Sequence, residues 1–207
     1  MSKGTLYTVA TPIGNLDDMT FRAVSVLREV DMVACEDTRE VVKLLERYEV
    51  GEKRLLSYHA QSKDSREDEI LAALEEGLSV AQVSDRGTPG ISDPGGRLIR
   101  RAVEAGVTVV PVPGASAIVT ALQAAGVDTS SFLYLGYMPH KKGRQTMTEL
   151  IAGEKRTTVF YESPHRLLKT LDALRGCGRQ VVVARELTKI HEEFVRGTAE
   201  EVWAEFD

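Results

Sequence analysis

The stretch Ser84-Asp85-Arg86-Gly87-Thr88-Pro89-Gly90-Ile91-Ser92-Asp93-Pro94-Gly95-Gly96 joins two segments whose hydrophobic patterns differ. Before it, residues 78–83 form a short apolar run that predicts a buried strand. After it, residues 97–103 show the apolar spacing of a helix. Ser92 or Asp93 is suited to cap this helix, and Pro94 suits its first turn. The sequence therefore predicts a strand, a glycine-rich loop and a helix N-terminus, an arrangement that binds ligands in open α/β sheets.

This loop is longer than a connection needs, because most strand-to-helix loops contain about two to six residues. Its four glycines and two prolines fix an unusual backbone path and expose backbone amides. The glycine spacing is not G-x-G-x-x-G, and Gly96-Arg97 stands where a P-loop requires Lys followed by Ser or Thr. The loop is thus a candidate ligand site that does not fit a nucleoside triphosphate. The alternative interpretation is a well-capped turn.

The composition is that of an ordinary globular chain: 43% of the 207 residues are hydrophobic, and the formal net charge is −5. This length allows one large domain or two small ones. The acidic balance argues against a free-standing nucleic-acid clamp but permits a local basic patch. No signal-peptide pattern or membrane-length apolar run is found, and Cys35 and Cys177 form no CxxC pair. These features predict a protein of the reducing cytoplasm.

Outward from the central loop, strands alternate with helices through the first half of the chain. The pattern predicts strands over residues 5–10, 31–35, 54–58, 78–83 and 107–112, with helices over 21–30, about 40–48, 62–76, 97–103 and about 117–125. Such alternation indicates an α/β fold with a mostly parallel sheet. If the strands are parallel, the loops after Ala10, Cys35, Val83 and Val112 share one edge of the sheet, where a site is expected.

The pattern changes after Gly126-Val127-Asp128-Thr129-Ser130-Ser131, which we interpret as a linker. We therefore expect two α/β domains, an N-terminal one at residues 1–125 and a C-terminal one at 126–207. The second is predicted to be mixed, with strands at 132–138, 157–161, 180–184 and 194–197, helices at 146–152 and 167–174, and a last helix capped by Thr198. We expect this second domain to be cut close to its end.

Six motifs along the chain resemble those of a known family. They are Thr11-Pro12-Ile13-Gly14-Asn15-Leu16, Cys35-Glu36-Asp37-Thr38-Arg39, Gly87-Thr88-Pro89 with residues 91–95, Pro111-Val112-Pro113-Gly114, Tyr161-Glu162-Ser163-Pro164-His165-Arg166, and residues 185–189 with 191–193. Their order resembles the bacterial 16S rRNA cytidine 2′-O-methyltransferases of the tetrapyrrole methylase superfamily. The resemblance implies S-adenosylmethionine in a cleft between two α/β domains, a homodimer, and 16S rRNA of the small ribosomal subunit as substrate.

The resemblance also implies which residues contact the cofactor. These are Ile13, Asp85, Gly87, Thr88, Ile91, Ser92, Ser116, Ala117, Tyr161 and Ala184. Without the resemblance, Ser116 and Ala117 are simply the start of a helix. Two positions depart from the family pattern, since Arg86 stands where a small residue is usual and Gly90 where a larger apolar one is usual. Arg86 either crowds the cofactor loop or points to solvent.

Methyl transfer to a ribose 2′-hydroxyl requires a group that accepts its proton, such as a carboxylate. Glu36 and Asp37 follow a predicted strand at the expected edge, and Arg39 is placed to hold Asp37 or a phosphate. The alternative is that Asp37 caps a helix while Glu36 and Arg39 are surface charges. The resemblance adds Lys189 and Glu192 as substrate-facing catalytic candidates, although such charge runs are usually solvated loops. The histidines lack ligand spacing, so we assign no metal.

For RNA, the strongest local basic segment is His140-Lys141-Lys142-Gly143-Arg144, with residues 100–101 and 53–54 elsewhere. The alternative is a solvated basic loop. Tyr134 and Tyr137 fit packing better than base stacking. Two other functions stay open at this stage: a tetrapyrrole or other small-molecule methyltransferase of the same fold, and a cofactor-binding module without turnover.

Overall fold

A computed structural model of the chain describes residues 2–59, 64–93 and 95–207. The predictions made for Pro94 and for the helix start at residue 62 fall outside these residues. The chain divides into two compact units, Met1–Ser116 (unit 1) and Ala117–Asp207 (unit 2). None of the helices in the described part of the chain combines the length and the apolar character needed to cross a membrane.

Unit 1 is built on a five-stranded sheet in which every pairing is parallel, as the strand–helix alternation predicts. The strand order is β3-β2-β4-β1-β5, so β4 is the central strand and lies between β2 and β1. The strands are β1 (Thr5–Val9), β2 (Met32–Cys35), β3 (Arg54–Ser57), β4 (Val80–Val83) and β5 (Thr108–Val112). Because β2 and β4 are buried along their whole length, they do not alternate between polar and apolar residues: β2 is entirely apolar, and β4 is apolar except for Gln82.

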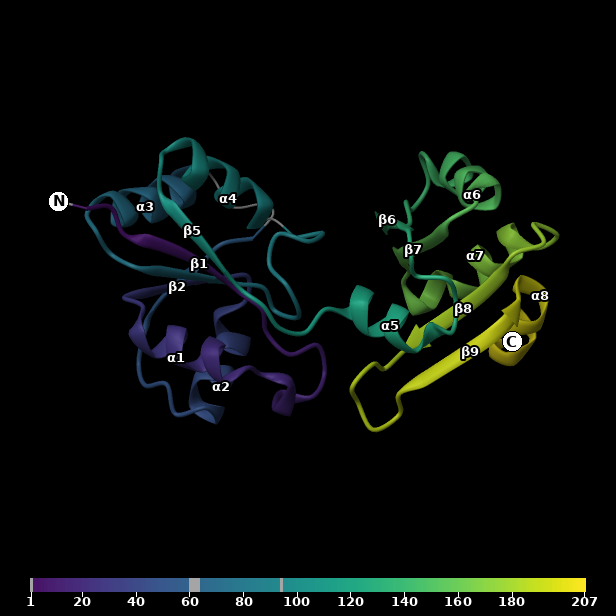
Figure 1. Cartoon of the computed structure of the whole chain (residues 1–207), viewed down its shortest axis with the longest axis horizontal. Helices are drawn as coiled ribbons and strands as arrows, with labels where there is room; N and C mark the ends of the chain where they lie inside the picture. Colours follow the sequence, from purple (N-terminus) through teal and green to yellow (C-terminus); the bar gives the residue numbers. More distant parts are fainter. Residues whose placement is uncertain (1, 60–63, 94) are drawn as a thin grey trace. The chain divides into compact units, whose positions relative to one another are not determined.

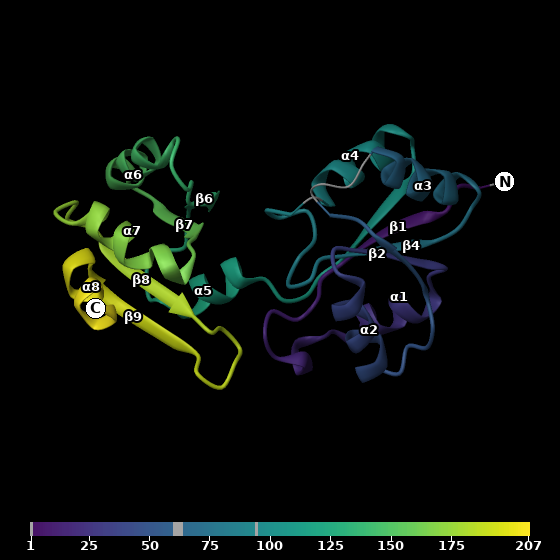
Figure 2. The same cartoon turned by 180° about the vertical axis from the view of Figure 1, so that it is seen from behind.

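Helices cover both faces of this sheet, α3 and α4 on one side and α1 and α2 on the other (Figures 1 and 2). Successive strand residues face opposite sides, so Met32 and Ala34 join the core under α3 and α4, while Val33 and Cys35 join the other core. The helices are α1 (Phe21–Glu29), α2 (Thr38–Arg47), α3 (Asp64–Glu75) and α4 (Gly95–Glu104), and a short 3₁₀ turn, η1 (Leu16–Asp18), precedes α1.

Unit 2 is a mixed α/β unit, as predicted, with one parallel and one antiparallel strand pair. Its strands are β6 (Phe132–Tyr137), β7 (Thr157–Tyr161), β8 (Gln180–Arg185) and β9 (Glu193–Thr198). Its helices are α5 (Ala117–Ala125), α6 (Arg144–Gly153), α7 (Leu167–Leu174) and α8 (Ala199–Phe206), with the 3₁₀ turn η2 (Pro164–Arg166). Thr198 caps α8 as expected, and Glu201 completes the capping box.

The division between the units lies before α5, whereas the sequence placed the domain boundary after that helix. The physical reason is the way α5 packs. It lies against β8 and β9, and the Arg196 side chain donates hydrogen bonds to the Ala124 and Ala125 carbonyls at its C-terminus. The glycine-containing segment at residues 126–131 indicates a linker, but it does not indicate whether the apolar helix before it packs on the N-terminal or the C-terminal unit.

Candidate active site

The loops after four strands of unit 1 begin side by side. Val9 at the end of β1 pairs with Val83 of β4 and with Val112 of β5, and Ala34 of β2 pairs with Gln82 of β4. Because these strands are parallel, their carboxyl ends reach one edge of the sheet together. The edge predicted from the sequence is therefore present, and the glycine-rich loop follows its central strand.

The first half of the glycine-rich loop is held against the loop after β1. Thr11 and Gly87 exchange backbone hydrogen bonds of 2.9 and 3.0 Å, and the Thr11 hydroxyl donates to the Ser84 carbonyl. The Ser84 hydroxyl in turn donates to the Gly87 carbonyl at 3.0 Å. Gly87 has a φ of +83°, and a Cβ atom there would lie 3.2 Å from Ile13 Cγ2. This position therefore favours glycine for its backbone conformation, and a larger residue would also crowd Ile13.

The second half of the loop is held by Asp93. One carboxylate oxygen accepts hydrogen bonds from the Gly90 and Gly95 amides, at 2.7 and 2.8 Å. Since Gly95 is the first residue of α4, this bond confirms Asp93 as a group that caps the helix start. Burial raises the pKa of Asp93, and the two amide bonds offset part of that shift. Ser92 adopts a φ of +63°, and the neighbouring Ile91 side chain is exposed.

The structure brings several of the predicted cofactor residues of unit 1 together. Ile13 lies beside Gly87, since a Cβ atom on Gly87 would be 3.2 Å from it, and the Thr88 hydroxyl donates to the carbonyl of Ala115, directly before Ser116. Arg86 is exposed on the loop and so points to solvent, which is one of the two alternatives given for it. Ala117 is the first residue of α5 and belongs to unit 2.

Glu36 and Asp37, adjacent in the sequence, have opposite electrostatic environments. The Arg39 guanidinium, 2.6 Å from Asp37, lowers the pKa of that carboxyl to about 2 through a hydrogen bond and its charge. Asp37 is also the N-cap of α2, since its Oδ1 atom accepts a bond from the Arg39 amide. The pKa of Glu36 is raised, first by burial and then by the charges of Asp85 and Asp93. Asp85 accepts a 3.0 Å bond from the Asp37 amide, which fixes it beside this pair.

Gln82 in β4 is a buried polar residue next to the glycine-rich loop that the sequence analysis did not single out. Its side chain is only 3% exposed, and its Oε1 atom has no hydrogen-bond partner among the described residues. Its Nε2 atom lies 1.7 Å from where a Cβ atom of Gly95 would be, which explains the glycine at the start of α4. The sequence did contain a signal for Gln82, because it is the one polar residue in the central strand β4. A buried polar group ordinarily has a hydrogen-bond partner, so such a residue invites a search for one.

In unit 2, three predicted cofactor residues line a cavity of about 260 Å³. Tyr161 from β7 and Ala184 from β8 contribute to its wall, together with Ala117 and much of α5. Lys189 and Glu192 instead lie in the β8–β9 connection, where the Lys189 ammonium pairs with Glu186 at 3.0 Å. The Glu192 carboxylate accepts a bond from the Thr188 amide. Both side chains thus close the hairpin loop, which supports the interpretation of a charged surface turn.

Three basic positions considered for RNA are occupied by internal contacts. Arg144 is 8% exposed and pairs with Glu162, and Arg101 pairs with the buried Glu67. Lys53 donates to the carbonyls at the end of α1. The prediction that Arg144 belongs to an exposed basic segment is therefore wrong, because the sequence does not indicate that a buried carboxylate lies beside it. His140, Lys141 and Lys142 are exposed, as expected.

Comparison with known proteins agrees with this geometry. A family model described as Tetrapyrrole (Corrin/Porphyrin) Methylases matches residues 5–202. A protein of Halalkalibacterium halodurans named ribosomal RNA small subunit methyltransferase I is 50% identical over 98% of this chain and 71% of its own length. Proteins of the same name from Escherichia coli O157:H7 and Thermotoga maritima are 49% and 45% identical, over 92% and 99% of this chain and 68% and 92% of their own lengths.

Solved structures share the fold at low sequence identity. A cobalt precorrin-4 methyltransferase matches with a TM-score of 0.70 and 19% identity, over 98% of this chain and 88% of that protein. A uroporphyrin-III C-methyltransferase from Thermus thermophilus, solved with S-adenosylhomocysteine, matches with a TM-score of 0.65 and 17% identity, over 99% and 92% of the two chains. At these identities the likeness establishes the architecture.

Proposed function

Because the chain belongs to the tetrapyrrole methylase family, we propose that it methylates the ribose 2′-hydroxyl of a cytidine in the decoding region of 16S rRNA. By family, the chain is a methyltransferase that uses S-adenosylmethionine. The observation that carries the rRNA substrate is the 50% identity, over 98% of this chain, to a relative named ribosomal RNA small subunit methyltransferase I. We further propose that it acts as a homodimer in the cytoplasm on the small ribosomal subunit.

The residues at the carboxyl edge of unit 1 fit this cofactor, which carries a positive sulfonium and supplies an already activated methyl group. Glu36, Asp85 and Asp93 place carboxylates beside the glycine-rich loop, a charge pattern that favours a cationic ligand and disfavours a phosphate. Gly87 holds the loop in a backbone conformation with a φ of +83°, which glycine adopts without strain. The acidic edge and the glycine loop thus suit a sulfonium donor.

We propose that the cofactor is held by the residues that the motifs indicated. In unit 1 these are Ile13, Asp85, Gly87, Thr88, Ile91, Ser92 and Ser116. Hydrogen bonds between Thr11 and Gly87, and from the Thr88 hydroxyl to the Ala115 carbonyl, fix the backbone of this loop. The contributions of Ala117, Tyr161 and Ala184 from unit 2 stay predictions.

Among the catalytic candidates, Glu36 is the carboxylate best suited to accept the ribose proton. Its raised pKa makes it a stronger base than a free glutamate, whereas Asp37 is held as a weak base by Arg39. We propose that Glu36 takes the proton from the 2′-hydroxyl, while Asp37 and Arg39 fix the start of α2 and so position Glu36. Lys189 and Glu192 stay candidates for contact with the substrate.

The test is to incubate the protein with small ribosomal subunits and radiolabelled S-adenosylmethionine. The expected result is label on the ribose of one cytidine in 16S rRNA, located by nuclease digestion and mass spectrometry. Naked 16S rRNA and a uroporphyrinogen substrate are assayed in parallel. Label on the tetrapyrrole alone would overturn the rRNA assignment while leaving the family and its cofactor intact.

Gly87→Ala should weaken cofactor binding. An alanine at a φ of +83° is strained by about 1–3 kcal/mol, and its Cβ would press on Ile13. If the loop shifts to relieve the strain, the dissociation constant for S-adenosylmethionine should rise by roughly 5- to 150-fold in calorimetric titration.

Gly106→Ala is the matched control for this substitution. Gly106 also has a positive φ, of +68°, but nothing lies within 4 Å of its Cβ position. This variant should lose stability without losing cofactor affinity. Equal affinity losses in the two variants would contradict a specific role for the loop at Gly87.

A further inference from the structure

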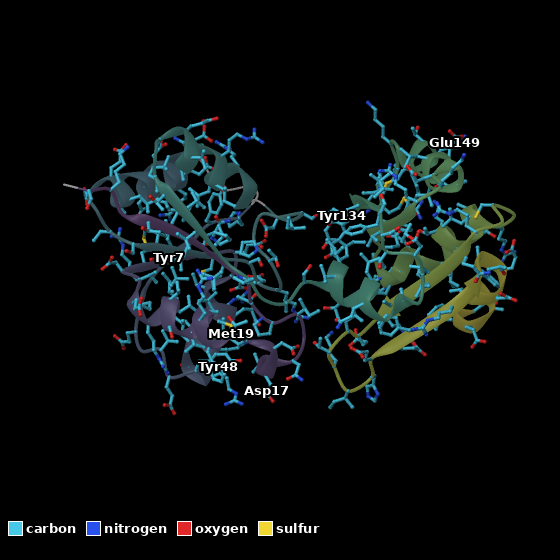
Figure 3. The ribbon with its side chains drawn as sticks, viewed as in Figure 1. Tyr7, Asp17, Met19, Tyr48, Tyr134 and Glu149 are labelled. Carbon is cyan, nitrogen blue, oxygen red and sulfur yellow. The ribbon has the colours of Figure 1, made fainter. Side chains whose placement is uncertain are left out.

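Three tyrosines of unit 2 form a cluster at the carboxyl end of the β6–β7 pair, which we call the tyrosine platform (Tyr134, Tyr137 and Tyr161). The Tyr137 ring lies 4.9 Å from the Tyr161 ring, centroid to centroid, at an angle of 34°. The Tyr134 ring meets Tyr161 edge-on at 5.9 Å. Tyr134, labelled in Figure 3, projects from β6. Tyr161 thus supports the other two rings, and Tyr137 is 61% exposed.

An irregularity in β6 makes this arrangement possible. In a regular strand, Tyr134 and Tyr137 would point to opposite faces, because side chains alternate. The pairing register shifts between these two residues, and Gly136 has a φ of +69°. Such a bulge redirects side chains and is frequent beside functional sites. The bulge therefore brings both rings onto Tyr161 and leaves the face of one aromatic ring in solvent.

The platform is neutral and is followed by positive charge. Burial, then the neighbouring tyrosines, raises the pKa of Tyr161 to about 12, so its hydroxyl carries no charge near neutral pH. The chain continues from Tyr137 into a loop where Lys141 and Lys142 are exposed. Neither lysine takes part in an ion pair within the described part of the chain.

The buried Arg144 and the partly buried Arg166 hold this lysine loop in place. Arg144 donates a 3.1 Å bond to the Pro139 carbonyl, and Arg166 donates a 3.2 Å bond to the Met138 carbonyl. Both arginines are themselves paired with the buried Glu162. These bonds hold the backbone at Met138 and Pro139, between Tyr137 and the two lysines, which follow the exposed ring by only four and five residues in the sequence.

We propose that the tyrosine platform stacks on a base of single-stranded RNA, with Lys141 and Lys142 on the adjoining phosphates. Exposed aromatic faces beside cationic side chains are typical of surfaces that bind unpaired nucleotides. The acidic edge of unit 1 repels phosphate, so an RNA substrate needs such a surface elsewhere on the chain. The inference rests on the proposed function, because it concerns how that substrate is gripped.

The test measures binding of a fluorescein-labelled single-stranded decoding-region RNA by anisotropy, without S-adenosylmethionine. Tyr137→Ala should weaken binding by roughly 5- to 150-fold, the range for loss of one stacked base. Tyr137→Phe keeps the ring and should bind within about twofold of the unchanged protein. Combined Lys141→Ala and Lys142→Ala should reduce the slope of log affinity against log salt by roughly 1.4, since each phosphate contact on a single strand contributes about 0.7.

Two controls separate this surface from other outcomes. Circular dichroism verifies that each variant is folded, and sedimentation reports its oligomeric state. If Tyr137→Ala binds RNA as tightly as the unchanged protein, the proposal is overturned. If its oligomeric mass also changes, the tyrosine platform is a protein interface instead. Methylation of small subunits by the unchanged protein is assayed separately, so failure of the proposed function and failure of the platform give different results.

Discussion

Glu36→Gln should lower the rate of methyl transfer to small ribosomal subunits by roughly 10²- to 10⁴-fold, the usual contribution of a positioned general base. Glutamine keeps the size and hydrogen-bonding capacity of the side chain but cannot accept the ribose proton. Affinity for S-adenosylmethionine should change little, because Asp85 and Asp93 keep the edge acidic. Single-turnover rates together with calorimetric titration of the cofactor check both parts of this result.

The pH dependence gives a second check on Glu36. A general base works in its deprotonated form, and the pKa of Glu36 is raised by burial and by neighbouring carboxylates. The rate should therefore fall as the pH drops, and this decline should begin at a higher pH than an ordinary glutamate would give. Glu36→Gln should lack this limb, while Asp37→Asn should keep it, because Asp37 titrates far lower, near 2. A limb that persists in Glu36→Gln would assign the base to another group.

Glu162→Ala should destabilise unit 2 by about 3–5 kcal/mol, because it leaves the Arg144 and Arg166 guanidinium groups buried without their partner. The Glu162 side chain is 6% exposed and lies 3.1 Å from Arg144 and 2.8 Å from Arg166. It also accepts bonds from the Thr170 hydroxyl and the Ser163 amide. Urea unfolding followed by Trp203 fluorescence reports on this unit, since Trp203 is the single tryptophan and lies in α8.

Two further variants calibrate the effect of Glu162. Glu162→Gln retains part of the hydrogen bonding and should lose less stability than the alanine variant. Asp172→Ala removes an exposed ion pair with Arg175 in the same unit and should cost under about 0.5 kcal/mol. A loss from Glu162→Ala no larger than that from Asp172→Ala would mean that the buried network contributes little.

Acid should remove the contribution of Glu162. Burial raises the pKa of Glu162, but the hydrogen bonds from Thr170, Ser163 and Arg144 and the charge of Arg166 outweigh it and lower the pKa overall. A carboxyl with a lowered folded-state pKa stabilises the fold above its unfolded pKa, and this stabilisation is lost as the pH falls through the folded value. The difference in stability between Glu162→Ala and the unchanged protein should therefore shrink at acid pH.

Local patterns were enough to predict the elements of both halves. The apolar runs before Ser84 and after Gly106 gave the strands, and Thr20 and Thr198 gave helix starts that the structure confirms. The parallel sheet followed from the alternation of strands and helices, and with it the shared edge of the loops. The six ordered motifs then gave the family. All of this depends on short-range spacing, which a linear sequence records directly.

The long-range pairings came only from the tertiary structure. Adjacent carboxylates look alike in the sequence, yet Arg39 makes Asp37 a weak base, while burial beside Asp85 makes Glu36 a stronger one. Arg144 appeared to continue a basic segment, but Glu162 from another element holds it inside unit 2. The sequence by itself determined which elements form and which edge carries the loops. Which charges are buried, paired or free depends on contacts between residues far apart in the chain, and local patterns do not encode these.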